Sequence, residues 1–295
     1  MEQAATKDRP AVRFECVTVE ASAEDDRHLA SIASPLLVAD LPDFLWWPSD
    51  GFVGSELFDD LTGVTDRLIV DTSVLPDPGV GLRFLAELVT GAKGCPNLSD
   101  FAWARLAPWR QLVAQFFDPP AALPSLETLS EVVISYGGAD GGTSGATAGL
   151  LMAGWLATRL GWRAPGELVA ATDGPGGWRA TLRAGARGHL REVVLIVRPT
   201  RDPIAARCLG AVELTSTGAH PGTFRVERVD TLGLSTRSET ASMPPVRRMV
   251  YATSPNDAGL LADDLRVFGR DRVYEESLAF AAGLAPSDAD GTPVS

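Results

Sequence analysis

The feature that most constrains the fold of this 295-residue chain is a change in the order of its predicted elements at the proline-rich segment 118–124. Before this segment, short apolar runs typical of strands alternate with longer segments typical of helices. The predicted strands lie at 12–20, 43–47, 66–72 and 101–104, and the predicted helices at 25–39, 56–62, 79–91 and 108–117. Such alternation favours a mostly parallel sheet with helices on its faces.

After the break, most strands follow one another directly. A strand at 129–135, a glycine-rich loop at 137–145 and an apolar helix at 146–160 come first; the next strands are predicted at 178–184, 190–198, 208–216, 223–229 and 246–252. Consecutive short strands favour an antiparallel sheet. Two helices, 257–268 and 271–282, each opened by an aspartate, end the pattern.

The sequence thus predicts an α/β protein with two domains. Residues 10–119 are expected to form a mostly parallel sheet with flanking helices, and residues 122–282 an α+β domain with an antiparallel sheet. Residues 283–295 are predicted to be a disordered tail.

Charge and composition exclude several classes of protein. The formal charge is −12, and the first 119 residues hold 9 basic and 19 acidic residues, so a nucleic-acid-binding role is not expected. The longest apolar run, 146–157, is shorter than the roughly 20 residues that a membrane helix needs. The polar start and the odd, widely separated Cys16, Cys95 and Cys208 predict a cytoplasmic protein without a disulfide framework.

The sequence offers no recognisable catalytic motif. The glycine-rich loop 137–145 lies between a strand and a helix, where phosphates bind, but it lacks a G-x-G-x-x-G spacing and the P-loop lysine. A connection with Thr143 or Ser144 capping the next helix is favoured. His28, His189 and His220 have no motif neighbours, and no metal-ligand spacing occurs. We therefore expect no catalytic residues, no cofactor and no metal, and hence a protein that is not an enzyme.

The unusual residues are tryptophans close to arginines. Tryptophan and arginine are enriched in interface hot spots, and strand ends in α/β sheets form binding crevices. The alternative is that Trp47 and Trp103 fill the core while Arg105 and Arg110 pair with nearby acids; for individual tryptophans the two readings are equally favoured. For the cluster as a whole we predict a partner-binding site. Its residues are Trp46, Trp47, Asp100, Trp103, Arg105, Trp109 and Arg110.

The same residues carry a resemblance to a known family. Leu41-Pro42 followed by Leu45-Trp46-Trp47-Pro48, the element Asp66-Arg67-Leu-Ile-Val-Asp71-Thr72-Ser73, and Asp100-Phe-Ala-Trp-Ala-Arg-Leu-Ala-Pro-Trp-Arg110 are similar to motifs of the glucose-6-phosphate dehydrogenase assembly protein family, OpcA. An apolar helix that ends in Arg159-Leu-Gly-Trp162 and the closing helices extend the resemblance over about residues 35–282. Further residues would be expected before the first strand.

The resemblance implies a non-catalytic partner that assembles or allosterically activates glucose-6-phosphate dehydrogenase, the NADP-reducing entry enzyme of the oxidative pentose phosphate pathway. One alternative is a sensor that binds a sugar phosphate or nucleotide beside the arginines. A second alternative is an unrecognised enzyme.

Overall fold

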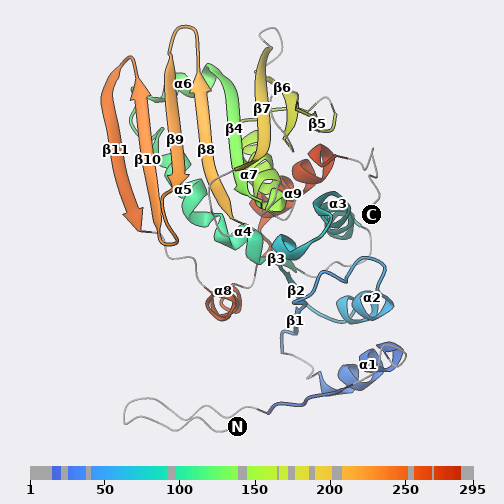
Figure 1. Cartoon of the computed structure of the whole chain (residues 1–295). Helices are drawn as coiled ribbons and strands as arrows, with labels where there is room; N and C mark the ends of the chain where they lie inside the picture. Colours follow the sequence, from blue (N-terminus) through green and yellow to red (C-terminus); the bar gives the residue numbers. More distant parts are fainter. Residues whose placement is uncertain are drawn as a thin grey trace, which may run out of the picture.

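The computed structural model describes residues 15–20, 26–37, 41–91, 97–138, 145–164, 166–171, 177–185, 190–200, 208–251, 256–267 and 269–286. Two sheets and the helices around them form the body of the molecule (Figure 1). The small sheet comes from the first third of the chain and the large sheet from the rest. The α/β class predicted from the sequence is therefore confirmed.

The small sheet is parallel throughout. Its strands are β1 (Phe44–Trp46), β2 (Arg67–Val70) and β3 (Asn97–Asp100), in the order β1-β2-β3. The connecting helices are α2 (Glu56–Thr62) and α3 (Pro78–Thr90), which begin after the side-chain caps Ser55 and Asp77. All four residues of β2 are buried, as expected for a central parallel strand.

The large sheet has the strand order β11-β10-β9-β8-β4-β7-β6-β5. The bounds of these strands are β4 (Leu129–Gly137), β5 (Val169–Ala170), β6 (Trp178–Ala184), β7 (Arg191–Thr200), β8 (Leu209–Ser216), β9 (Gly222–Arg228), β10 (Gly233–Thr240) and β11 (Met243–Tyr251). All neighbouring pairs are antiparallel except β4 and β7, which run parallel because the chain crosses over through a helix between them. The sheet is therefore mixed, with a parallel pair at its centre.

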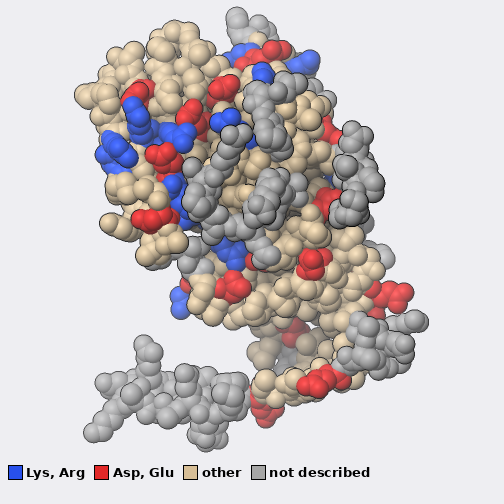
Figure 2. Space-filling view, in the orientation of Figure 1, with Lys and Arg blue, Asp and Glu red and all other residues tan. Residues whose placement is uncertain are grey.

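One face of the large sheet is covered by helices, and the other carries charges. Helices α5 (Ala107–Gln115), α7 (Ala146–Arg159) and α9 (Arg272–Leu284) lie on the covered side, in one continuous apolar core with α3. On the other face Arg225 pairs with Glu213 and Glu227, and Figure 2 shows basic and acidic groups alternating over this part of the molecule. Residues on that face thus neutralise one another across neighbouring strands.

Helix α8 (Asp257–Asp264) returns from the large sheet to the small one. Leu260 of α8 packs with Ile69 of β2 and Phe101 in a separate apolar cluster, next to Phe44 of β1. The opposite face of the small sheet contributes Leu68 and other residues to the main core. Residues from the end of the chain therefore cover one face of a sheet formed at its beginning.

Two predicted strands are wrong. Residues 101–104 form α4 (Phe101–Arg105), because the carboxylate of Asp100 accepts a hydrogen bond from the Ala102 N–H and starts a helix; the strand β3 lies just before it. In the predicted strand 12–20, residues 15–20 are extended but pair with no described strand, and residues 12–14 lie outside the described residues. An alternating pattern forms a strand only where a partner strand is present.

Several smaller differences have local causes. The helix predicted at 25–39 is divided into α1 (Asp26–Ala33) and a 3-10 turn (Ser34–Leu36) that contains Pro35. Asn256, and not Asp257, caps α8. The sequence patterns missed β5, β10 and the short α6 (Leu123–Glu127). Helix α9 continues to Leu284 and Ala285 is buried, so the predicted tail 283–295 begins with ordered residues; 287–295 lie outside the described residues.

The caps predicted at Thr143 and Ser144 also fall outside the described residues. Helix α7 is preceded by Gly145, which provides no side-chain cap. None of the helices in the described part of the chain combines the length and the apolar character that crossing a bilayer requires.

Helices α7 and α9 lie close together at Gly154, and this contact leads to a first prediction. A Cβ at Gly154 would collide with the Ser277 carbonyl oxygen and lie 3.3 Å from the Ala281 nitrogen. We expect Gly154→Ala to lower the free energy of unfolding by about 1–3 kcal/mol through overpacking. Chemical denaturation would measure this loss.

Gly283 provides the matched control, because it also lies in a helix but has open space where a Cβ would be. Gly283→Ala should leave stability unchanged or raise it by up to about 1 kcal/mol. Equal losses in both variants would show that helix contact at Gly154 is not the cause.

Candidate functional site

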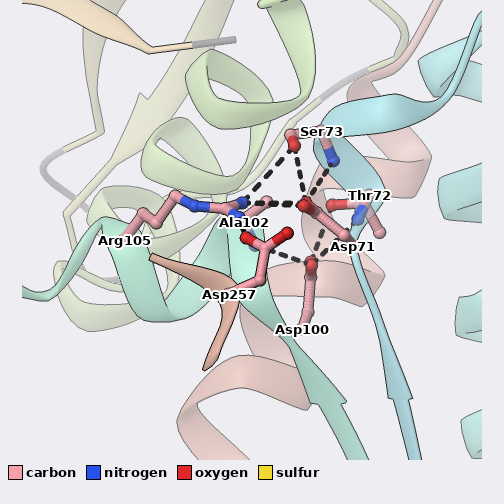
Figure 3. A network of polar contacts seen from close by, with 7 residues as sticks. All are labelled: Asp71, Thr72, Ser73, Asp100, Ala102, Arg105 and Asp257. Atoms are coloured by element: carbon pink, nitrogen blue, oxygen red, sulfur yellow. Dashed lines mark hydrogen bonds and ion pairs between the residues drawn. The ribbon is translucent and has the colours of Figure 1, made fainter. Parts of the chain in front are cut away.

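The predicted cluster lies where β2 and β3 end. Asp71 follows β2 and caps the 3-10 turn η2 (Thr72–Val74) by accepting from the Ser73 N–H at 3.1 Å. Asp100 is the last residue of β3 and caps α4. Because the carboxyl ends of neighbouring parallel strands meet at one edge, the two aspartates lie near each other, as Figure 3 shows.

Asp100 is the buried centre of this edge. One carboxylate oxygen accepts from the backbone N–H groups of Thr72 and Ala102, at 3.0 and 2.9 Å. The other accepts from the Thr72 hydroxyl at 2.7 Å and from the Tyr274 hydroxyl at 3.1 Å. Asp100 therefore connects η2, α4 and α9.

Burial determines the charge state at this position. Asp100 is 3% exposed, and burial, followed by the neighbouring charge of Asp71, raises its pKa from 3.8 to about 6. The hydrogen bonds from Thr72 and Ala102 lower the pKa and limit this rise. Burial and the adjacent carboxylate also raise the pKa of Tyr274 well above 10, so its hydroxyl keeps the proton that it donates to Asp100.

Arg105 bridges the start and the end of the chain. One guanidinium nitrogen donates to both carboxylate oxygens of Asp71, at 3.0 and 2.9 Å, and another donates to Asp257 of α8 at 2.8 Å (Figure 3). The Arg105 side chain is 21% exposed, whereas that of Asp257 is 61% exposed. The contact with Asp71 is thus the better shielded of the two.

Trp103 makes a second contact with the C-terminal helices. Its indole N–H donates to Asp271, the cap of α9, at 2.9 Å, and its ring lies against that of Tyr274. The guanidinium of Arg110 lies 3.4 Å from the centroid of the Trp103 ring and donates to the Trp103 carbonyl. Burial lowers the pKa of Arg110 from its usual value to about 10, which leaves it charged at neutral pH.

The other three tryptophans of the predicted cluster lie in three different surroundings. Trp109 is buried, with the guanidinium of Arg228 5.7 Å from its ring. Trp47 packs edge-on against Phe58, and its buried indole N–H has no partner among the described residues. Trp46 is 39% exposed and lies next to Phe101, with ring centroids 6.0 Å apart.

The structure thus brings Asp100, Trp103, Arg105 and Arg110 together, while Trp47 lies in the core on the other face of the sheet. Sequence reasoning missed partners that lie far along the chain. These are Asp71, Thr72, Asp257, Asp271 and Tyr274. Two of these residues had a signal in the sequence: Asp71 follows a predicted buried strand, and Asp271 stands where a helix cap is expected.

The arrangement has little free space for a ligand. A cavity bordered by Arg105, Trp109, Cys208 and Arg228 has a volume of about 20 Å³, enough for roughly one water molecule. Among the described residues, no group of three or more His, Cys, Asp or Glu side chains is placed to hold a metal ion. The polar groups of the cluster mostly bind one another, so its evident role is to join α4 to α8 and α9, with Trp46 exposed beside it.

The α/β fold is similar to that of a solved structure. A 3-ketoreductase from Actinomadura kijaniata has a similar fold, with a TM-score of 0.50 at 17% identity, over 85% of this chain and 77% of that one. At this identity the similarity concerns the fold alone.

The family is defined by sequence. The model of the glucose-6-phosphate dehydrogenase subunit N-terminal domain matches residues 2–87, and that of the C-terminal domain of the same subunit matches residues 96–278. The chain therefore belongs to this OpcA family, and the resemblance is confirmed.

Curated cyanobacterial relatives agree with this assignment. An OpcA protein from Synechocystis, named for the OxPP cycle, is 27% identical over 92% of this chain, and one from Synechococcus elongatus is 28% identical over 91%. The matches cover 55% and 59% of these relatives, so the chain spans little more than half of their length.

The contacts of Arg105 lead to a prediction about stability. Arg105→Ala removes the guanidinium nitrogen that donates to both carboxylate oxygens of Asp71, and leaves this half-buried carboxylate without its cation, close to the buried Asp100. We expect a loss of about 1–3 kcal/mol in the free energy of unfolding, measured by urea denaturation. Arg266→Ala, in a 78% exposed pair with Asp263, is the control and should change stability by no more than about 0.5 kcal/mol. Equal losses in the two variants would show that the contacts of Arg105 stabilise the fold no more than an exposed surface pair does.

The raised pKa of Asp100 leads to a prediction about pH. Between pH 3.8 and about 6 the folded protein holds this proton more tightly than the unfolded chain does. Protonation of Asp100 therefore adds to the free energy of unfolding, fully below pH 3.8. This contribution is lost as the pH rises through 6, and the loss is about 3 kcal/mol at 1.36 kcal/mol per pKa unit.

Asp100→Asn removes this titration, and its amide is able to donate to the hydroxyls of Thr72 and Tyr274. The difference in the free energy of unfolding between the wild type and Asp100→Asn, measured by urea denaturation, should decrease as the pH rises across that range. Parallel stability curves for the two proteins would show that the pKa of Asp100 is not raised.

Proposed function

We propose that this protein is a non-catalytic cytoplasmic partner of glucose-6-phosphate dehydrogenase that promotes its assembly or activates it allosterically. The observation that carries the proposal is the pair of adjoining matches to the two domains of the glucose-6-phosphate dehydrogenase subunit family, over residues 2–87 and 96–278. The names of the curated relatives, which refer to the OxPP cycle, support the same pathway. Activation would increase NADPH production at the entry to that pathway.

The arrangement of the candidate site supports a binding role. In open α/β sheets, ligands bind at the carboxyl ends of the strands. Here Asp71 and Asp100, at two of those ends, already contact Arg105 and Tyr274 of the same chain. A site whose polar groups are satisfied internally is suited to hold an exposed surface in place rather than to perform chemistry on a substrate.

Within the predicted partner-binding cluster, exposure assigns different roles. Asp100, Trp103 and Trp109 are buried, and we propose that they position the surface. Trp46 is exposed next to Phe101, and we propose that it contacts the dehydrogenase directly. Exposed tryptophans beside a well-packed aromatic group are typical interface anchors.

At the carboxyl ends of the small sheet, where the ligand-sensor alternative places its ligand, the structure gives this alternative little support. The cavity beside Arg105 and Arg228, of about 20 Å³, is too small for a sugar phosphate. A rise in melting temperature of the isolated protein with glucose 6-phosphate or NADP would favour the sensor.

The direct test measures the rate of the cognate dehydrogenase against substrate concentration, with and without this protein, together with size-exclusion chromatography of the mixture. We expect a higher kcat or a lower apparent KM, because an activator must bind the active form more tightly than the inactive form. Co-elution should accompany the change in rate. If neither occurs, the proposal is wrong for this chain.

Trp46→Ala tests the proposed anchor. We expect the concentration required for half-maximal activation to rise about tenfold, as for the loss of an interface hot spot. Leu190→Ala removes another exposed apolar side chain, 65% exposed and directly before β7, and should leave activation unchanged. Thermal melts of both variants would separate lost binding from lost folding.

A further inference from the structure

Residues 15–20, here called the arm, have the pattern of a strand but no partner strand. The sequence Glu-Cys-Val-Thr-Val-Glu alternates, and every residue of it is exposed, including Val17 at 66% and Val19 at 44%. The arm forms no hydrogen bond with any other described residue. In Figure 1 it extends from the body beyond α1. An extended segment with free N–H and C=O groups is suited to pair with the edge of a sheet.

The large sheet has a long free edge at β11. The strand has nine residues, whereas the edge strands β5, β1 and β3 have two, three and four. Pro244 and Pro245 protect only its first part. The following six residues, 246–251, contain no proline, and their exposed apolar side chains include Met249 at 51% and Tyr251 at 83%. This edge equals the arm in length.

The charges of the two segments are opposite. The arm contains Glu15 and Glu20 and no basic residue, whereas β11 contains Arg247 and Arg248 and no acidic residue. Neither arginine has a carboxylate partner among the described residues. Because side chains alternate along a strand, each segment places one of its two charges on each face. The glutamates are five positions apart and the arginines are adjacent, so in any one register a single glutamate lies close to an arginine, while the opposite net charges of the two segments favour their pairing.

We propose that the arm of one copy of this protein adds a strand to the β11 edge of a second copy. Figure 1 shows the arm beyond α1 and β11 at the outer edge of the large sheet, so a second molecule is the natural donor. Two copies exchange arms reciprocally, which gives a closed twofold dimer. Val17 and Val19 gain apolar neighbours at Met249 and Tyr251 or at Val246, and an edge open to aggregation becomes paired.

Sedimentation equilibrium of the full chain over a range of concentrations tests this proposal. Wild-type protein should form a dimer, while Glu15→Arg/Glu20→Arg and Arg247→Glu/Arg248→Glu should each raise the dimer dissociation constant about tenfold through like-charge repulsion. The variant with all four reversals restores the opposite charges and should dimerise like the wild type. If either double substitution weakened the dimer by disturbing the fold, adding the other one would not restore dimerisation.

Asp50→Arg/Asp60→Arg is the matched control, because both residues are exposed and the change in charge equals that in the arm variant. It should leave the dissociation constant unchanged. A wild-type protein that stays monomeric overturns the proposal, as does a dimer that none of the reversals weakens or that the fourfold variant fails to restore.

Discussion

The buried carboxylate of Asp100 is the interaction on which the join between the two parts of the molecule depends. It accepts four hydrogen bonds, from η2, α4 and α9, at a position where burial alone would exclude a charge. An unpaired buried carboxylate costs several kcal/mol, and these donors offset much of that cost. The same atoms that satisfy Asp100 therefore fix the relative position of the small sheet and the C-terminal helices.

The contacts that surround Asp100 become more exposed to solvent with distance from it. Arg105 and Trp103 add further connections to Asp257 and Asp271. Trp46, at the outside, packs against Phe101 but leaves part of its ring in solvent. A rigid support beneath an exposed aromatic ring reduces the entropy lost when a partner binds, which is the property that a regulatory surface needs.

Local patterns predicted the elements with clear periodicity, such as the buried strand β2 and the helix α2. They failed at 101–104, because four mainly apolar residues have no distinguishing period and the cap at Asp100 determined the outcome. They identified Arg105 and Trp103 but not their partners. Tyr274 lies 174 positions after Asp100, and no spacing rule links residues at that separation.

Helix α8 has a consequence for the order in which the chain is able to fold. Its Leu260 covers Ile69 and Phe101, and its Asp257 contacts Arg105, so the small sheet is completed by residues synthesised roughly 150 to 190 positions later. During translation, the first part of the chain leaves the ribosome with one apolar face uncovered. Until the last helices emerge, this face is open to any chaperone or neighbouring chain that meets it.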